Sequence, residues 1–429
     1  MRQLVNHLKG DKGIWSFVAL LALFSFMPVF SASSNLAYLG HGTGNTLGYL
    51  VKHFIHICCG FAIIFSVHKI PYNYFRSISK MLLPVVWVVL AITMIKGQVI
   101  AGANASRWLQ IPFVGISFQP SAFAALVLFV FVARYLSKTR EEPIDFVQSL
   151  KELWLPVFIT LMFILPSNFS TTALIFAMII MLVFIGRYPL KYIGVIVGAG
   201  LLSLAFFVLV AKAFPGSFNN RVSTWESRIE TYFSDAQDED DYQIEKAKIA
   251  IASGRIYGLG PGKSVQKNFL PQSSSDFIYA IIVEEYGLIG GLGVLTLYLL
   301  LMFRFVVASH KATTLFGKLV VIGLGFPMIF QAMINMAVAV ELLPVTGQTL
   351  PLISSGGTSI WMTCIALGII IGVTKKEDEI EEEAKNAAKR EEALQKMIDD
   401  HLESDKEKDD LGYSIENKVA NPMNAVLNK

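Results

Sequence analysis

Hydrophobic residues run along this chain in long blocks, separated by short segments rich in polar and charged residues. A block of about 20 apolar residues forms a helix long enough to cross the hydrocarbon core of a bilayer. We predict ten such membrane-spanning helices, at residues 14–31, 47–68, 79–97, 117–137, 153–166, 171–186, 190–213, 276–303, 317–342 and 348–373. The fifth and sixth are short and separated only by Ser167–Ser170, so one interrupted element is an alternative. The pattern indicates an all-α polytopic membrane protein.

The composition agrees with this fold class. Of the 429 residues, 54% are hydrophobic and only 16% are charged, and the mean hydropathy is +0.54. Soluble globular domains carry about 25% charged residues, so the composition excludes that class. The first apolar block follows a basic start without a small-residue cleavage site, and we expect it to be retained as a span.

The placement of Lys and Arg predicts how the helices are oriented. Alternate connecting segments are basic, with Arg2, Lys9 and Lys12; Lys69, Arg76 and Lys80; Arg134, Lys138, Arg140 and Lys151; Arg187 and Lys191; and Arg304, Lys311 and Lys318. The intervening loops 32–46, 167–170 and 343–347 carry none, and 98–116 carries only Arg107. Because cytoplasmic loops hold the excess of basic residues, both termini are expected in the cytoplasm. The same rule places the long loop 214–275 outside the cell.

The outer loop 214–275 is too long to be a simple connection, which indicates a functional role. It contains an acidic tract from Asp235 to Asp241 and then the sequence YQIEKAKIAIASGRIYG. This second part can form a short amphipathic helix at the membrane surface, or a helix packed on the rest of the protein.

Three regions are therefore expected: a cytoplasmic N-terminus (1–13), a transmembrane domain (14–373) and a charged cytoplasmic tail (374–429). The tail is dense in Glu and Lys. Residues 376–404 favour helix by propensity, with pairs such as Glu381–Lys385, and disorder is expected beyond them.

Asp276 is the most informative candidate for chemistry, because it lies where the polar outer loop enters the eighth span. Lys263, Gln266 and Lys267 precede it closely. A carboxylate at such a boundary can act as a base, but Asp at the first position of a helix is also a favoured N-cap. The spacing leaves both roles open.

Three other patterns have simpler explanations. Gly260–Ser264 (GPGKS) resembles a phosphate-binding loop, but Tyr257 stands where that motif needs glycine. His53 and His56 lie one helical turn apart and could bind a metal, although such a pair more often lies near a helix end or against polar neighbours. Glu284 and Glu285 lie over two turns into the eighth span, so each is expected to face a cavity or a partner rather than lipid.

Several segments resemble the signature of the SEDS family (shape, elongation, division and sporulation). The stretch from Tyr242 to Gly291 resembles its pattern YQ…AIGSGG…GxGxGxSxQK…LPExHTDFIFxIIxEExGxxG. The segment INMAVAVELLPVTGQTLPLISSGGTSIW resembles its NxG…LLPxTG-xTLPFxSYGGSS. The segments ANASRWLQI, FQPSAFA and SNFSTTA resemble its NGARRWI, QPSEFAK and PDLGTA. The matches follow family order over residues 100–373, and the division-associated members of a Bacteroidetes-like type are the most similar.

The resemblance implies a peptidoglycan glycosyltransferase of the cytoplasmic (inner) membrane. Such an enzyme polymerises lipid II, an undecaprenyl-pyrophosphoryl disaccharide-pentapeptide, at the outer membrane face. The expected partners are a class B penicillin-binding transpeptidase and other membrane proteins of the division machinery, with no nucleic acid. Alternatives are a lipid II flippase, a division scaffold with little chemistry, and a role in elongation rather than division.

The resemblance also implies site residues. The family's catalytic aspartate maps onto Asp276, which is then the general base of an inverting transfer. Positions expected to bind substrate are Arg107, Trp108, Gln119, Lys263, Gln266, Lys267, Gln272, Ser275, Ser354, Gly356, Gly357 and Ser359, of which Gln272 and Ser275 differ from the family residue. No cofactor is certain, and a divalent cation (Mg²⁺ or Mn²⁺) is the one candidate, with unknown ligands.

The chain also departs from the family pattern by losing charged or titratable residues. Gln272 replaces Glu, and Ser274 and Ser275 replace His and Thr. Ala122 and Ala125 replace a Glu and Lys pair on one helix face, while Asn168 replaces Asp and Thr346 replaces Lys. Because the pair at 122 and 125 is lost together, neither charge is left without its partner. Asp276 is therefore nearly the only candidate base at the outer face.

Overall fold

The computed structural model describes residues 9–39, 46–97, 108–110, 117–139, 144–213, 239–270, 272–375, 385–386, 388–393 and 395–397. The chain divides into two compact units, residues 1–374 and 375–429. In the second unit, the described stretches between 385 and 397 are helical and solvent-exposed. Of the acidic tract, residues 235–238 lie outside the described residues.

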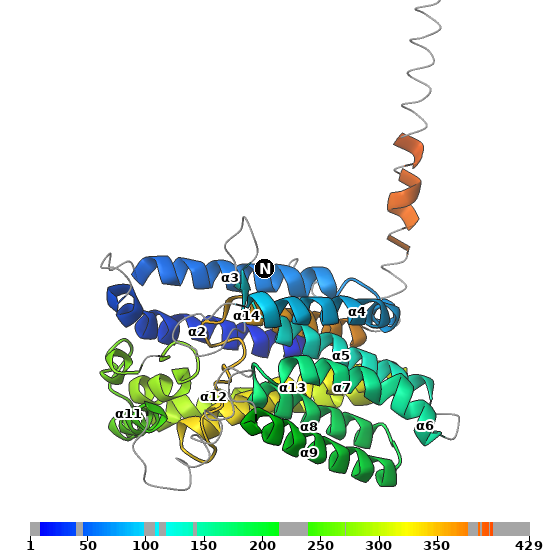
Figure 1. Cartoon of the computed structure of the whole chain (residues 1–429). Coiled ribbons are helices and arrows are strands. Elements are labelled where there is room, and N and C mark those ends of the chain that lie inside the picture. Colours follow the sequence, from blue (N-terminus) through cyan, green and yellow to red (C-terminus); the bar gives the residue numbers. More distant parts are fainter. Residues whose placement is uncertain are drawn as a thin grey trace, which may run out of the picture. The chain divides into compact units, whose positions relative to one another are not determined.

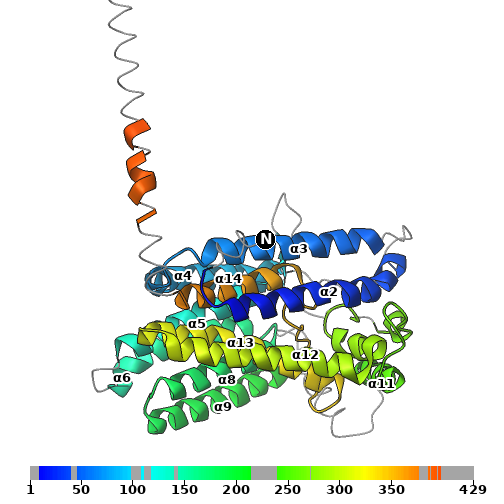
Figure 2. The ribbon, with the colours of Figure 1, turned by 180° about the vertical axis from the view of Figure 1, so that it is seen from behind.

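The first unit is a bundle of long apolar helices (Figures 1 and 2). In chain order these are α2 (Lys12–Leu39), α3 (Thr46–Val67), α4 (Asn73–Lys96), α5 (Pro120–Lys138), α6 (Phe146–Ser149), which continues through the π-helical turn η1 (Leu150–Trp154) into α7 (Leu155–Ile164), α8 (Phe169–Ile185), α9 (Leu190–Ala213), α12 (Ile278–Lys311), α13 (Leu315–Ala339) and α14 (Gly357–Val373). The remaining elements are α11 (Glu239–Gly254), the short 3₁₀ helix η2 (Gln266–Asn268) and two antiparallel strands, β1 (Leu109–Gln110) and β2 (Ser117–Phe118).

The prediction of an all-α polytopic membrane protein is confirmed. Eight of the described helices, counting α6 to α7 as one, are long and apolar enough to cross a membrane. The other two predicted spans are α8 and α14, each of 17 residues and so about 25 Å long. The fifth and sixth spans are separate helices, because the side chain of Asn168 caps α8 by accepting the N–H of Thr171 at 3.2 Å.

The last predicted span begins later than the pattern indicates. Helix α14 starts at Gly357 rather than at residue 348, and residues 340–356 form an irregular segment. Leu352 in this segment has a φ of +65°, a left-handed conformation that a helix cannot contain. We call residues 340–356 the pocket loop, because part of it lines the cavity described below.

The helices bury apolar side chains between them and leave others on the outer surface. Helix α3 packs on α14, α12 on α13, and α4 on α5. Tyr298 and Phe305 of α12 are completely buried. Helix α9 instead exposes Leu202, Phe206 and other large apolar side chains, as expected for a surface that faces lipid.

Helix α12 is interrupted at Gly287, whose φ of 69° and ψ of −172° are not helical. Residues 255–260, which follow α11, form backbone hydrogen bonds with both sides of the interruption. The N–H groups of Leu259 and Gly260 donate to the carbonyls of Glu284 and Glu285, both at 2.9 Å. On the other side, Leu288 N–H donates to the carbonyl of Arg255 at 2.8 Å, and Ile289 N–H donates to that of Ile256 at 3.3 Å. The polar groups freed by the break are therefore satisfied within the protein.

Helix α11 lies against α12 and secures this arrangement. Its residues Ile244, Ala247 and Ala250 are buried, so these residues form a packed helix rather than a membrane-surface one. Its exposed Lys248 forms an ion pair at 2.6 Å with Glu341, in the pocket loop just after α13.

Replacement of Gly287 by alanine tests the importance of the interruption. The added Cβ would lie 2.2 Å from the carbonyl oxygen of Ile256 at a positive φ. We expect Gly287→Ala to lower the free energy of unfolding by at least about 2 kcal/mol, measured by thermal unfolding in detergent. Gly293→Ala on the same helix is the control, because no atom lies within 4 Å of its added Cβ. Equal melting temperatures for the two variants would contradict this account of the interruption.

Candidate functional site

A cavity of about 640 Å³ opens between α3, α5, α8, α13 and α14. Residues 272–276, which precede α12, and parts of the pocket loop complete its wall. It lies at the end of the bundle that the charge pattern assigns to the outside. A volume of this size is typical of a small-molecule or cofactor site.

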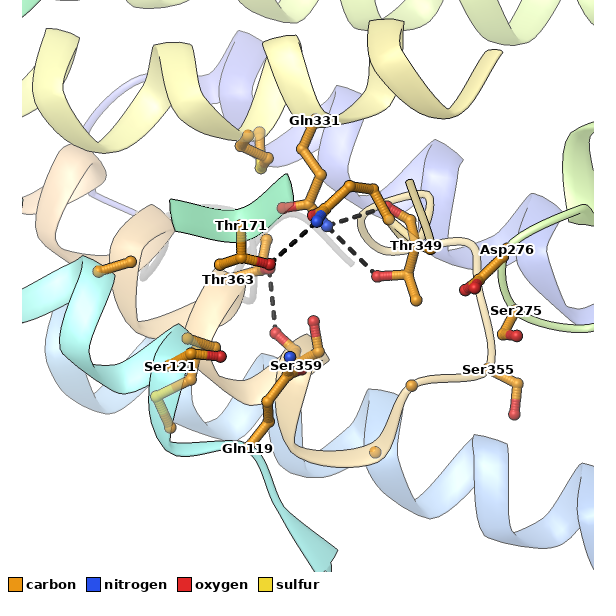
Figure 3. Close-up of a pocket in the computed structure, with 18 of the residues that line it drawn as sticks. Gln119, Ser121, Thr171, Ser275, Asp276, Gln331, Thr349, Ser355, Ser359 and Thr363 are labelled. Carbon is orange, nitrogen blue, oxygen red and sulfur yellow. Dashed lines mark hydrogen bonds between the residues drawn. The ribbon is translucent and has the colours of Figure 1, made fainter. Parts of the chain in front are cut away.

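Three consecutive backbone carbonyl groups of the segment that carries Asp276 accept hydrogen bonds from other parts of the protein. Ser355 N–H donates to the carbonyl of Ser274 at 2.9 Å, and Ser354 Oγ donates to that of Ser275 at 2.6 Å. The Nδ2 group of Asn335 on α13 donates to the carbonyl of Asp276 itself at 2.7 Å. The N-cap position of α12 is occupied by Phe277, so Asp276 is not the helix cap. Its carboxylate belongs to the cavity wall (Figure 3).

Hydroxyl and amide groups form much of the wall near Asp276 and across the cavity from it. Figure 3 shows Asp276, Ser275 and Ser355 on one side, and Thr171, Thr363 and Ser121 on the other. Such groups can donate to and accept from sugar hydroxyls without adding charge.

Two amides hold the pocket loop in place across this space. Gln331 Nε2 donates to the carbonyl of Thr349 at 2.9 Å. Gln348 Nε2 donates to Thr171 Oγ1 at 3.0 Å, which ties the loop to α8.

One face of α3 contributes a polar stripe of Tyr49, Lys52, His53 and His56. Their spacing of i, i+3, i+4 and i+7 places all four on one side of the helix. His53 is buried and shares a hydrogen bond of 2.8 Å with Ser25 Oγ. His56 stacks on Trp361, so polar and aromatic neighbours account for the histidine pair.

The inner end of the cavity is apolar. Ala122 and Ala125, where the family pattern has a charged pair, are both in the wall. Deeper side chains are Leu126, Phe129, Leu174, Ile175, Leu324, Pro327, Met328, Met362 and Ala366. The lost charges therefore leave an inner end that is mostly apolar, where the hydroxyl of Thr363 donates to the carbonyl of Ser359 at 3.1 Å.

Most of the residues indicated by the resemblance lie in this wall. They are Trp108, Gln119, Gln272, Ser275, Asp276, Gly356, Gly357 and Ser359. Ser354 is buried immediately behind the wall, where it also accepts the N–H of Leu350 at 2.7 Å. Arg107 lies outside the described residues.

Lys263, Gln266 and Lys267 are not part of the cavity wall, because their loop folds over the two glutamates of α12. Glu284 accepts the N–H groups of Val265 and Gln266, at 2.9 and 3.2 Å, and the hydroxyl of Ser264. Lys267 Nζ donates to Ser31 Oγ at 3.2 Å and to the carbonyl of Gly262 at 2.9 Å.

Both glutamates face protein rather than lipid. Glu285 accepts the hydroxyl of Ser31 and the N–H of Ser264, and both carboxylates are fully buried. Hydrogen bonds to a charged group contribute about 1.5–3 kcal/mol each. The glutamates therefore fix residues 258–267, the glycine-rich loop, rather than line the cavity.

The sequence analysis did not identify Lys52, Gln331, Gln348, Thr349 or Ser355 as site residues. For Lys52 a signal was present, since the polar stripe at 49, 52, 53 and 56 crosses an apolar span on one face. Residues of the pocket loop gave no such signal, because their place in the wall depends on tertiary contacts.

The cavity does not contain a ready-made metal site. Within the described parts of the chain, no group of three His, Cys, Asp or Glu residues could hold a metal ion, and Asp276 is the one carboxylate of the described wall. Magnesium in protein sites takes one or two carboxylates and otherwise relies on phosphates and water. The described wall residues do not build a site for the expected divalent cation, and the proposed glycosyl transfer does not involve one.

Comparison with known proteins identifies similar sequences over most of the chain. The family model of the FtsW, RodA and SpoVE cell cycle proteins matches residues 11–379. A probable peptidoglycan glycosyltransferase FtsW of Hydrogenovibrio crunogenus is 30% identical over 364 residues, covering 84% of this chain and 90% of that protein. Stage V sporulation protein E of Bacillus subtilis is 28% identical over 361 residues, covering 83% and 94%.

Solved structures show the same fold. The crystal structure of the rod shape determining protein RodA of Thermus thermophilus has a TM-score of 0.61 at 22% identity, covering 86% of this chain and 98% of that one. A chain from a study of polymerization and crosslinking by a peptidoglycan synthase complex has a TM-score of 0.64 at 22% identity, covering 85% and 97%.

The access to the cavity can be tested by cysteine labelling in intact cells, after Cys58, Cys59 and Cys364 are replaced by serine. We expect Ala122→Cys, in the cavity wall, to react with a small charged methanethiosulfonate added from outside. The control is Ala133→Cys on the same helix, because Ala133 is completely buried. Equal reaction at both positions, or none at Ala122→Cys while it reacts in inside-out vesicles, would contradict the outward-facing cavity.

Proposed function

The chain belongs to the FtsW, RodA and SpoVE family of cell cycle proteins, and on that premise we propose that it polymerises lipid II at the outer face of the inner membrane. The observation that carries this proposal is a cavity with Asp276 at its polar mouth and Lys52 in its wall. A carboxylate and a cation in one pocket are the two groups that glycosyl transfer from a pyrophosphate requires.

The reaction joins two lipid-linked disaccharides. The 4-hydroxyl of the acceptor GlcNAc attacks the anomeric carbon of the donor, and a new glycosidic bond forms there with inversion. The bond between that carbon and the pyrophosphate oxygen breaks, and undecaprenyl pyrophosphate leaves with the electron pair. Asp276 takes the proton of the attacking hydroxyl as general base.

Lys52 is the residue we assign to the departing pyrophosphate. It is the one permanent cation among the described residues of the cavity wall, since Lys263 and Lys267 lie elsewhere and the family's charge at position 125 is absent. Negative charge grows on the pyrophosphate as the bond breaks, and a fixed cation nearby stabilises it. The hydroxyls and amides of the wall then serve the neutral sugars.

The apolar inner end of the cavity favours polymerisation over lipid transport. A flippase must carry a charged headgroup across the membrane, and it therefore needs polar groups along the whole path. Here the lining changes to Leu126, Phe129, Leu324 and Met328. A scaffold with little chemistry would have no need for a polar pocket of this size.

Division rather than elongation is the role suggested by the relatives named FtsW. Their names give peptidoglycan glycosyltransferase as the activity. A class B penicillin-binding transpeptidase that crosslinks the new strands is the partner we propose, in line with the synthase complex that shares the fold.

Replacement of Asp276 tests the assignment of the base. Asp276→Asn keeps the shape of the side chain but cannot accept the proton, so we expect glycan formation from purified lipid II to fall at least about 100-fold. Binding of lipid II to the purified protein should stay within about twofold, because the pocket is otherwise unchanged. Polymerisation by Asp276→Asn at the wild-type rate would remove Asp276 from the mechanism.

Replacement of Lys52 tests the assignment of the cation. Lys52→Ala should lower the polymerisation rate roughly 10- to 100-fold, and Lys52→Arg should retain much of it, because the charge is kept. Lys263→Ala is the control, since its exposed side chain is not part of the cavity wall. A larger loss of rate for Lys263→Ala than for Lys52→Ala would indicate that Lys263 in the glycine-rich loop, and not Lys52, stabilises the departing pyrophosphate.

A further inference from the structure

Asn335 connects the backbone of Asp276 to the pocket loop through one side-chain amide. It lies in the last turns of α13 and is completely enclosed, with 1% of its surface exposed. Its Nδ2 group donates one hydrogen bond to the carbonyl of Asp276 and another to the carbonyl of Gln348, both at 2.7 Å. A primary amide has two N–H groups, so both of its donors are used.

The orientation of this amide is determined by its surroundings. Its Oδ1 atom is buried and has no hydrogen-bond partner among the described residues. If the amide were reversed, this oxygen would face two carbonyl oxygens and both donors would be lost. The amide is therefore held by the Asp276 and Gln348 carbonyls, and it serves no other buried group that the structure describes.

The contact lies immediately before the start of α12 at Ile278. Within the first turn of the helix, the N–H groups of Ala280 and Ile281 donate to the carbonyl of Phe277. The carbonyl of Asp276, one residue earlier, accepts the amide of Asn335. Asp276 thus stays in the turn before α12, where its side chain can line the cavity.

We propose that Asn335 is a positioning residue for the reaction: it holds the Asp276 carboxylate and the Gln348 segment of the pocket loop in one fixed relation. The bond from Ser354 to the carbonyl of Ser275 supports the same backbone from the other side. This inference rests on the proposed role of Asp276 as base. A displacement of about 1 Å at a catalytic group can cost about 100-fold in rate, so loss of the amide should affect the chemical step more than substrate binding.

The test compares two replacements of Asn335 in the full-length protein with its transpeptidase partner. Asn335→Ala removes both donors. Asn335→Asp has nearly the shape of Asn but presents carboxylate oxygens to two carbonyl oxygens. We expect the kcat of polymerisation to fall about 10-fold for Asn335→Ala and further for Asn335→Asp, with KM for lipid II within about twofold. Ser354→Ala, which loosens the neighbouring carbonyl, should lower kcat in the same way.

Two comparisons make the result decisive. Ser309→Ala removes a side-chain bond of 3.2 Å to the carbonyl of Lys318, between the far ends of α12 and α13, and should leave both kinetic constants unchanged. Activities are referred to the monodisperse, folded fraction of each variant. Wild-type kcat in Asn335→Asp, or losses for Asn335→Ala and Ser354→Ala that only follow the folded fraction, would overturn the proposal.

Asp276→Asn is measured in the same assay, so that the inference can be separated from the proposed function. If Asp276→Asn polymerises like the wild type, the assignment of the base fails. If it is inactive while Asn335→Asp and Ser354→Ala keep the wild-type kcat, only the positioning role of Asn335 fails.

Discussion

The backbone hydrogen bonds between residues 255–260 and the two sides of the break at Gly287 are the constraint on which the outer half of the protein depends. A helix broken in or near a membrane exposes carbonyl and N–H groups that lipid cannot satisfy. Residues 255–260 supply four bonds to the two sides of the break. Because this segment follows α11 directly, the same contacts fix α11 and the start of the glycine-rich loop. Glu284 and Glu285 then hold the remainder of that loop.

These contacts explain how acidic residues can lie within a bundle of apolar helices. Charges within a membrane protein are costly unless they are paired or surrounded by donors. The two glutamates meet backbone amides and serine hydroxyls, while Asp276 lies in the wall of a cavity. The former hold a loop of the protein, whereas the latter lines the cavity. In the sequence all three are simply acidic residues near the start of one span.

Much of the fold follows from the sequence, because ten apolar blocks of sufficient length leave few alternatives. The start of the last helix could not be predicted, since LPLIS in the pocket loop is as apolar as a helix, and the left-handed Leu352 is a tertiary effect. Eight of the thirteen residues indicated by the resemblance lie in the cavity wall. Local motifs cannot reveal that Asn335 contacts the carbonyl of Asp276 or that Lys52 lines the same cavity, because only tertiary packing brings these parts of α13 and α3 to the site.

The apolar inner end of the cavity has a consequence for the energy supply of the cell. A bacterium stores energy as a gradient of protons and ions across its inner membrane, and a continuous file of water through any protein would discharge that gradient. A cavity of about 640 Å³ between the helices is such a risk, since it can admit water into the bundle. Leu126, Phe129, Leu324 and Met328 at its inner end offer water no hydrogen-bonding partners. The same side chains that close the inner end of the cavity thus act as an electrical insulator.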